Sequence, residues 1–528
     1  VGNGAHMVWL GSPSAGVRLK LKGDGAAWDS PRFVVTSRRL IPRAWAGDDS
    51  SGGCDVTRGE GQTKRTEVRC FSGYQLLKRG AAPRRLRFDL LLTPSREPDL
   101  RRHWARRGVQ HGYQKSYTPS DALALGASFV NIHQGTRANP WINYPLDSVA
   151  SLQTWTHATR AKKARLKIYF TTRELSTRTP EIFALHSMGG ILFDGSPLMR
   201  DSLIDDEKDP NHEKGVTGHA WLQERLRNNY STAWATTVSA KDDLVDTAVH
   251  VSGSSRWNNW YVEAVHQMAA YEPKIDGLYL DGVAYDRTTM RRVRAVLERA
   301  CAGRPACEID FHSGNTLASP MRKVSPALAI MQHMPYMDSL WLGEGFFWDR
   351  DPDYWLAEVS GIPYGLMGET LGGPPELGLV YGMAPRAMND GTGKHATAIW
   401  RLWDAYAIAD ASMLGYWDSR CPVAAAAVGR ADVAVRATAF VKEGDRLALV
   451  AIGVFGGTRF DGRVRLTAPH LEWWSGAAMR VGLGGRRAEL LKVGYSNGAL
   501  DLGVKRGARG IVLLLADDEA KLAPIARR

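Results

Sequence analysis

The chain has 528 residues, of which 44% are hydrophobic, and a formal net charge of +13. This length is too great for one hydrophobic core and predicts several domains. No apolar run reaches the ~18 residues of a membrane-spanning helix, which excludes a membrane span. The basic clusters are not interleaved with stacking aromatics, so we expect no nucleic-acid partner, although an anionic glycan or cell wall would be attracted.

The first 117 residues are predicted to form an N-terminal β-sandwich. Residues 17–23 and 85–92 alternate apolar and polar side chains with the two-residue period of strands. Gly, Pro and Ser separate these runs, as in antiparallel sandwiches. Residues 93–98 then resemble a linker.

The five cysteines form two plausible pairs. Cys301 and Cys307 border a short loop that contains Gly303 and Pro305, and Cys54 and Cys70 flank a polar stretch of hairpin character. We expect both pairs to be disulfides and hence a secreted or lumenal protein. No Cys-x-x-Cys or His-rich pattern is present, so we expect neither a metal nor another cofactor.

Residues 118–420 alternate strand-like and helix-like segments. This order predicts a parallel sheet, and a strand count near eight favours a (β/α)8 barrel of the TIM type. After residue 420 the pattern returns to strands, with a hairpin at 437–450 and a buried strand at 510–515, so residues 421–528 are predicted to form a C-terminal β-sandwich. The predicted barrel strands are 127–133, 166–172, one between 234 and 251, 275–281, 308–312, 340–344, 362–367 and 413–417.

Three acidic residues follow predicted barrel strands. Asp281 ends the run IDGLYLD, Glu344 ends SLWLGE and Glu369 ends YGLMGE. Barrel enzymes assemble their active sites from such strand ends. Cleavage of a glycosidic bond generally needs two carboxyl groups, so Asp281 and Glu344 are our predicted catalytic pair. Either acid could instead be a structural acid that caps a turn or pairs with an arginine.

Other residues in the predicted strand-end loops are candidates for substrate binding. Asp286 could alternatively begin the next helix, and a histidine at a strand end could bind a sugar or tune a neighbouring acid. Aromatic rings in these loops could form a sugar platform, although many of the 18 tryptophans will be core residues. The candidates are Glu174, Asp286, His312, Glu369, Trp260, Trp341 and Trp348, with Trp141, Trp257, Tyr285 and Phe346 as further aromatic candidates.

Three segments together resemble glycoside hydrolase family 123, the β-N-acetylgalactosaminidases, and its relatives. They are residues 88–94 (FDLLLTP), 276–282 (DGLYLDG) and 341–365. The resemblance implies an N-terminal β-sandwich, a catalytic (β/α) barrel and a C-terminal β domain. In that family an Asp orients the acetamido group of the substrate as nucleophile and the adjacent Glu is the acid. Here Asp281 is followed by Gly282, so the adjacent acid is missing.

The leading hypothesis is a glycoside hydrolase that acts on glycans containing N-acetylhexosamine. It would retain anomeric configuration by substrate assistance or through a covalent enzyme, with Asp281 on the nucleophilic side and Glu344 as acid/base. One alternative is an α-glycosidase-like retaining barrel enzyme on neutral sugars, which would explain the missing Glu. The other is an inactive glycan-binding or structural protein, which loss of the adjacent acid would favour.

Overall fold

The structure is a computed structural model of the 528-residue chain. It describes residues 6–23, 41–58, 65–112, 117–172, 174–187, 232–239, 241, 244–251, 257–282, 285–313, 326–342, 348–370, 374–388, 393–455, 460–482, 489–490 and 498–526. Within these ranges, no helix is long and apolar enough to cross a membrane.

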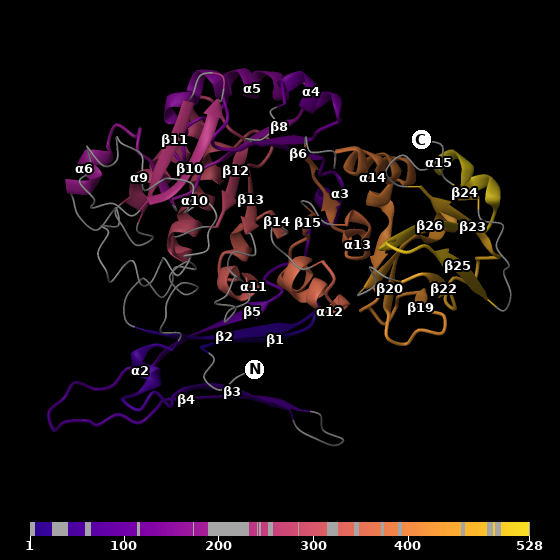
Figure 1. Ribbon diagram of the computed structural model, residues 1–528, viewed down its shortest axis with the longest axis horizontal. Coiled ribbons are helices and arrows are strands. Elements are labelled where there is room, and N and C mark those ends of the chain that lie inside the picture. The colour runs from indigo at the N-terminus through magenta and orange to yellow at the C-terminus, as the bar shows by residue number, and fades with distance from the viewer. Residues whose placement is uncertain are drawn as a thin grey trace.

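The N-terminal part contains a three-stranded antiparallel sheet and a separate hairpin (Figure 1). The sheet has the order β1 (Met7–Gly11), β2 (Gly16–Lys22), β5 (Arg87–Thr93), and the hairpin joins β3 (Gly53–Arg58) to β4 (Thr66–Phe71). Two strands of the sheet, β2 and β5, coincide with the predicted alternating runs. The predicted sandwich as a whole stays a prediction.

The central part is built on a seven-stranded parallel sheet with the strand order β14-β13-β12-β8-β7-β6-β17. Its strands alternate with helices along the chain, which is the arrangement of a TIM-barrel-like domain. The strands are β6 (Gly108–His111), β7 (Phe129–Ile132), β8 (Arg165–Tyr169), β12 (Gly277–Asp281), β13 (Glu308–Ser313), β14 (Ser339–Leu342) and β17 (Ala387–Met388). The principal helices are α4 (Pro119–Ala124), α5 (Val149–Ala161), α9 (Trp257–Ala270), α10 (Arg287–Ala300), α11 (Pro326–Ile330), α13 (Pro375–Val380) and α14 (Gly393–Tyr406).

Two further parallel strands adjoin this sheet. Strand β15 (Glu369–Thr370) pairs with β16 (Ala384–Pro385), and Gly368 forms a single parallel bridge to Leu340 of β14. Only Arg386 separates β16 from β17 in the chain. The short strands are therefore connected to both ends of the seven-stranded sheet.

Several predicted barrel strands were wrong. The stretch between 234 and 251 forms an antiparallel hairpin of β10 (Thr232–Ser239) and β11 (Leu244–His250), and β11 also pairs with β9 (Glu174–Ser176). This hairpin is an excursion outside the parallel sheet. Its apolar alternation satisfies a hairpin as well as a barrel strand, so the pattern could not separate the two.

The predicted first, seventh and eighth strands also need correction. The parallel sheet includes β6, which precedes the expected start of the barrel at residue 118. Residues Ile362–Tyr364 form a 3-10 helix between two left-handed glycines, Gly361 and Gly365. Strand β18 (Ser412–Leu414) pairs with the C-terminal strand β20 rather than with the barrel.

The C-terminal part consists of two antiparallel sheets that share one hydrophobic core. The larger sheet has the order β18-β20-β21-β26-β23-β24 and the smaller β19-β22-β25. The predicted hairpin is confirmed as β20 (Ala434–Lys442) and β21 (Leu447–Phe455). The other strands are β19 (Ala424–Ala427), β22 (Gly462–Thr467), β23 (Ala477–Val481), β24 (Glu489–Leu490), β25 (Ala499–Val504) and β26 (Gly510–Ala516). Inward residues of both sheets, such as Val450 and Leu502, form the shared core.

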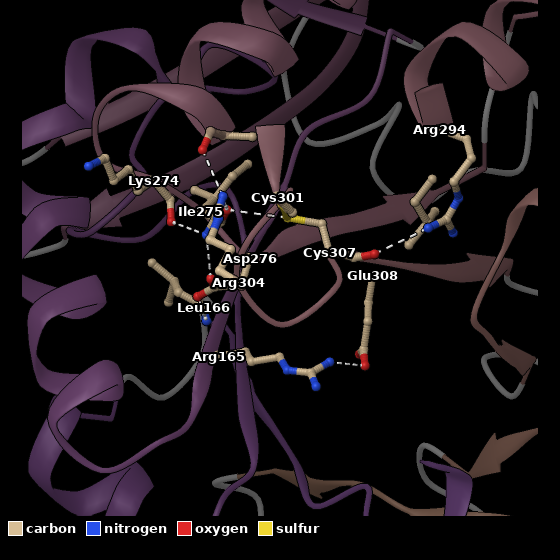
Figure 2. Close-up of a disulfide and its surroundings, with 12 residues drawn as sticks. Arg165, Leu166, Lys274, Ile275, Asp276, Arg294, Cys301, Arg304, Cys307 and Glu308 are labelled. Carbon is tan, nitrogen blue, oxygen red and sulfur yellow. Dashed lines mark hydrogen bonds and ion pairs between the residues drawn. A yellow bond between two sulfur atoms is a disulfide. The ribbon is translucent and has the colours of Figure 1, made fainter. Parts of the chain in front are cut away.

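Both predicted disulfides are present. Cys54 and Cys70 face each other directly across the β3–β4 hairpin. Cys301 and Cys307 close the turn between α10 and β13, with their Cα atoms 5.8 Å apart. Inside this turn, Arg304 donates to the Asp276 carboxylate at 2.7 Å and to the main-chain oxygens of Ala269 and Ile275 (Figure 2). The disulfide loop therefore holds the chain that enters β12.

Removing the second disulfide should lower the free energy of unfolding by about 2 kcal/mol, because the bond closes a short loop in the unfolded chain. The change is the double replacement Cys301→Ser with Cys307→Ser, followed by denaturant unfolding. Cys421→Ser is the matched control, because Cys421 is the free cysteine among the described residues and should have a much smaller effect. Alkylation of Cys301 and Cys307 without reductant would contradict the bond itself.

Candidate functional site

Asp281 lies at the carboxyl end of β12, the end of a parallel sheet at which barrel enzymes place catalytic groups. Along the sheet it is level with His312 of β13, and His312 is level with Trp341 of β14. The Tyr169 hydroxyl, at the end of β8, donates to Asp281 Oδ2 at 3.4 Å. Four neighbouring strands thus bring one residue each to the same end of the barrel-like sheet.

Aromatic rings on the neighbouring strands pack together beside this carboxylate. Tyr279 lies 5.1 Å from Tyr169 and 4.9 Å from Trp341 between ring centroids, and His312 lies 4.1 Å from Trp341. His133, directly after β7, lies 4.8 Å from Tyr169. We name His133, Tyr169, Tyr279, His312 and Trp341 the aromatic layer. Such a layer offers flat apolar faces together with hydroxyl, imidazole and indole groups beside one carboxylate.

The sequence singled out His312 and Trp341 but missed Tyr169, Tyr279 and His133. The signal was available in the two-residue period of strands, because Tyr279 and Asp281 must point to the same side of β12. Neighbouring Leu278 and Leu280 are fully buried on the opposite side. The same period places Tyr169 and Lys167 together on β8.

The loop after β7 borders the aromatic layer and is fixed by buried amides. Asn139 Nδ2 donates to the main-chain oxygen of Tyr169 at 3.4 Å, and Asn143 Oδ1 accepts from the Thr171 main-chain N–H at 2.8 Å. Asp246 of the β10–β11 excursion accepts from the Ile142 N–H at 2.7 Å. Burial raises the pKa of Asp246 to about 6, so this anchor is ionised only above mildly acidic pH. The predicted binding residue Glu174 is buried beside it, and its main-chain oxygen accepts from Asn143 Nδ2.

Glu369 lies in a buried ion network. Its carboxylate accepts from Arg106 Nε at 2.7 Å and Arg386 Nε at 2.6 Å. Burial alone would raise the pKa of Glu369, but Arg106 and Arg386 lower it below its ordinary value. A carboxylate held ionised between two guanidiniums is a poor proton donor.

The same network lies on the parallel sheet beside the aromatic layer, one pleat nearer the amino ends of the strands. Lys167 Nζ donates to both oxygens of Asp310 at 2.9 Å, and Arg106 bonds Asp310 and Glu308 at 2.7 and 2.8 Å. Arg386 bonds Asp310 at 2.8 Å and places its guanidinium 4.1 Å over the Trp341 ring. The network therefore contacts the aromatic layer through Arg386 and Trp341.

The remaining predicted site residues have other surroundings. Asp286 is the N-cap of α10, with its carboxylate accepting from the Thr289 N–H at 2.8 Å. Trp260 stacks on Trp257 with ring centroids 4.0 Å apart, and Trp348 lies 5.2 Å from Trp355. Glu344 and Phe346 lie outside the described residues.

Gly282, which stands where the family has a Glu, forms a turn directly after Asp281. Its φ is +58°, in the left-handed region that favours glycine, and its N–H donates to the His312 main-chain oxygen at 3.0 Å. The tight turn thus tethers β12 to β13 directly beside the carboxylate.

Replacing Gly282 with Ala should cost about 1 kcal/mol of stability, because a side chain disfavours this backbone conformation. A thermal or denaturant unfolding curve would measure the change. Gly303→Ala is a matched control for backbone conformation, since Gly303 has φ +80° in the disulfide loop and no atom within 4 Å of an added Cβ. If both variants lose a similar free energy of unfolding and only Gly282→Ala loses hydrolytic activity, the turn at Gly282 contributes to the site. If the two variants are equally active, it does not.

Two family profiles match the chain over most of its length. The TIM-barrel domain of glycoside hydrolase 123 matches residues 99–388, and the C-terminal domain of glycoside hydrolase 123 matches residues 395–473. The chain belongs to glycoside hydrolase family 123. As a family 123 protein it is a glycoside hydrolase, and its substrate is carbohydrate. The resemblance found in the sequence is confirmed, and its match begins before residue 108, so it includes β6.

Solved structures give weaker likenesses to this family 123 chain. The α-amylase of Geobacillus thermoleovorans, complexed with acarbose, is 10% identical with a TM-score of 0.45, covering 78% of this chain and 98% of that one. The α-amylase of H. orenii is 9% identical with a TM-score of 0.41, covering 76% and 91%. A GH36 α-galactosidase of Geobacillus stearothermophilus is 11% identical with a TM-score of 0.40, covering 78% and 55%. A search of curated proteins finds no match.

Proposed function

We propose that this family 123 hydrolase cleaves glycosidic bonds of glycans that contain N-acetylhexosamine, with Asp281 at the reacting centre. The observation that carries the proposal is the Asp281 carboxylate at the end of β12, hydrogen-bonded by the Tyr169 hydroxyl and bordered by the aromatic layer. A carboxylate beside flat rings suits a sugar, because the rings stack on its apolar face while the acid acts at the anomeric carbon.

In the proposed mechanism, Asp281 acts on the nucleophilic side of the sugar. It either orients the substrate's acetamido oxygen for attack on the anomeric carbon or attacks that carbon itself. Tyr169 positions Asp281 through its hydrogen bond at 3.4 Å.

Glu344 is the proposed acid/base, two residues after the end of β14 in the sequence. It would donate a proton to the departing glycosidic oxygen and then take one from the attacking water. A separation of about 5–5.5 Å between the two carboxyl groups would support a covalent retaining pair, and about 6.5–9.5 Å an inverting pair. Gly282 is the observation that favours the second candidate, an α-glycosidase-like retaining enzyme on neutral sugars, because the family's adjacent Glu is absent.

We further propose that these parallel strands close into one (β/α)8 barrel between an N-terminal sandwich, which ends before β6, and a C-terminal one (residues 421–528). The parallel β15–β16 pair and the Leu340–Gly368 bridge support closure. The two disulfides support a secreted or lumenal location, since such bonds persist in oxidising compartments.

The test is a panel of nitrophenyl glycosides that contains N-acetylhexosaminides and neutral hexosides of both anomers. Turnover of N-acetylhexosaminides that disappears in Asp281→Asn supports the proposal. Turnover of neutral hexosides alone supports the second candidate. Glycan binding without turnover of any member of the panel would leave a binding protein and overturn both.

A further inference from the structure

Exposed apolar side chains gather in one stretch of the N-terminal part. Among the residues that the structure describes, the large hydrophobic side chains that are exposed all lie between residues 74 and 92, except Tyr271. Phe88, Leu90 and Leu92 of β5 are 53%, 60% and 73% exposed. Contiguous exposed apolar surface of this kind marks an interaction site on a folded protein. The other members are Tyr74, Leu76, Leu77 and Leu86, and we name the whole set the 74–92 surface.

The β5 side chains share one face of the three-stranded sheet. Phe88 pairs with Leu21, Leu90 with Leu19 and Leu92 with Val17 across the β2–β5 ladder. On β1 and β2 this face is covered by the β3–β4 hairpin, because Leu21 packs with Cys54 and Trp45 (Figure 1). The opposite face of β5 turns toward the central domain, where Leu91 packs against the main core. The outer face of β5 is therefore the part of the sheet left uncovered.

The segment before β5 is hydrogen-bonded to residues 44 and 45, beside the β3–β4 hairpin. Arg84 donates to the Ala44 main-chain oxygen at 2.9 Å, and Trp45, the next residue, donates its indole N–H to the Arg87 main-chain oxygen at 2.8 Å. Leu86 directly precedes β5. The main-chain N–H groups of Tyr74 and Leu76 donate to the carboxylates of Asp49 and Asp48, which follow helix α2 (Arg43–Ala46).

The surface is strongly basic as well as apolar. Between residues 74 and 92 the chain carries five basic residues and one acid, and Lys78, Arg79, Arg85 and Arg87 are exposed. The one acid, Asp89, is paired with Lys22 at 3.4 Å. The whole chain adds a long-range attraction to anions through its net charge of +13.

We propose that the 74–92 surface docks the enzyme on an anionic phospholipid bilayer. Five of its seven exposed apolar side chains are leucines, which gain free energy in an acyl environment but offer no ring or hydrogen bond to a polysaccharide. The basic residues match anionic headgroups. A second copy is a poorer occupant, because a two-fold contact would bring the basic residues of both copies together.

Co-sedimentation with vesicles tests the proposal on the full chain. Vesicles of phosphatidylcholine mixed with phosphatidylglycerol should bind at least about tenfold more tightly than phosphatidylcholine alone, and salt should weaken the binding. The triple variant Phe88→Ser, Leu90→Ser, Leu92→Ser should lose about tenfold in vesicle affinity, because membrane binding scales with buried apolar area. Tyr271→Ser, which removes an exposed ring elsewhere (58% exposed), should not.

A second variant, which removes charge, tests the proposal even if the triple serine variant does not fold. Lys78→Gln with Arg79→Gln should weaken binding to the anionic vesicles only, whereas Arg401→Gln with Arg463→Gln, two exposed arginines elsewhere, should change it less. Circular dichroism would confirm folding, and hydrolysis of a water-soluble glycoside should be unchanged in every variant. Equal binding to both vesicle types, or no binding, would overturn the proposal. So would a wild-type dimer that the triple variant dissociates, which would make the surface a protein–protein interface.

Discussion

Asp281→Asn should lower turnover by at least ~100-fold while leaving the fold intact, which is the scale of losing one acid–base or nucleophilic contribution. The change keeps the side-chain volume and the Tyr169 hydrogen bond to an oxygen. It removes the charge that would orient or attack the substrate. Steady-state kinetics on the best nitrophenyl glycoside, with an unfolding curve on the same sample, would measure both effects.

Asp286→Asn is the matched control, because it makes the same chemical change five residues further along the chain. The side chain of Asp286 caps α10, and Asn caps a helix almost as well as Asp. Activity and stability should therefore stay near those of the wild type. If Asp286→Asn abolished turnover and Asp281→Asn did not, the assignment of the reacting carboxylate would move to the helix cap.

Glu344→Gln separates the two proposed roles. A substrate whose leaving group needs no protonation, such as a nitrophenolate, should partly rescue this variant but not Asp281→Asn. A natural glycan should be hydrolysed at least ~100-fold more slowly. Full activity of Glu344→Gln on natural glycans would remove Glu344 as the acid.

The sequence predicted a barrel-like domain followed by a C-terminal β domain better than it predicted the individual strands. Strand β12 was found as a short apolar run and β13 as a short alternating one, because each is followed or preceded by a segment of helical character. Short strands such as β15, with two residues, carry no periodic signal. The β10–β11 hairpin alternates as a barrel strand would, and its antiparallel pairing, within the hairpin and with β9, separates it from the parallel sheet.

The sequence revealed the candidate carboxylate at one strand end, but it did not reveal the residues that contact that carboxylate from distant parts of the chain. Asp281 could be placed because an apolar strand stops at Asp-Gly, but Tyr169 joins it across 112 residues of sequence. Glu369 had the same pattern as Asp281 and lies instead between Arg106 and Arg386. The run before Glu369 could not reveal those arginines, because they precede β6 and follow β16.

The buried ion network should be the most sensitive polar element of the barrel. Lys167→Met should lower the free energy of unfolding of the central domain by about 3–5 kcal/mol, because it leaves buried carboxylates incompletely paired. Lys167 is fully buried, contacts both Asp310 oxygens at 2.9 Å and lies 3.6 Å above the Phe129 ring. Met has a similar length and keeps the contact with that ring. Thermal and denaturant unfolding followed by tryptophan fluorescence would measure the loss.

The pH dependence of this loss has a definite sign. Burial alone would raise the pKa of Asp310, but Lys167, Arg106 and Arg386 lower it below its ordinary value, and Lys167 and Arg106 do the same for Glu308. Their contribution to stability is therefore present above the ordinary carboxyl pKa of about 4 and is lost as the pH falls below it. Without Lys167 both carboxyl pKa values rise, so acid unfolding should begin at higher pH in Lys167→Met than in the wild type.

Asp501→Asn gives the control for this comparison. Asp501 forms two hydrogen bonds with Arg465 at 2.8 and 2.9 Å, as short as those of the network, but the pair lies at the surface. An exposed pair is screened by water and salt, so its loss should change neither the unfolding midpoint nor the onset of acid unfolding. If Lys167→Met and Asp501→Asn change the free energy of unfolding equally, the buried network contributes no more to stability than a surface ion pair does. A large effect confined to Lys167→Met, with reduced turnover, would identify the ion network as the support of the aromatic layer and hence of Asp281.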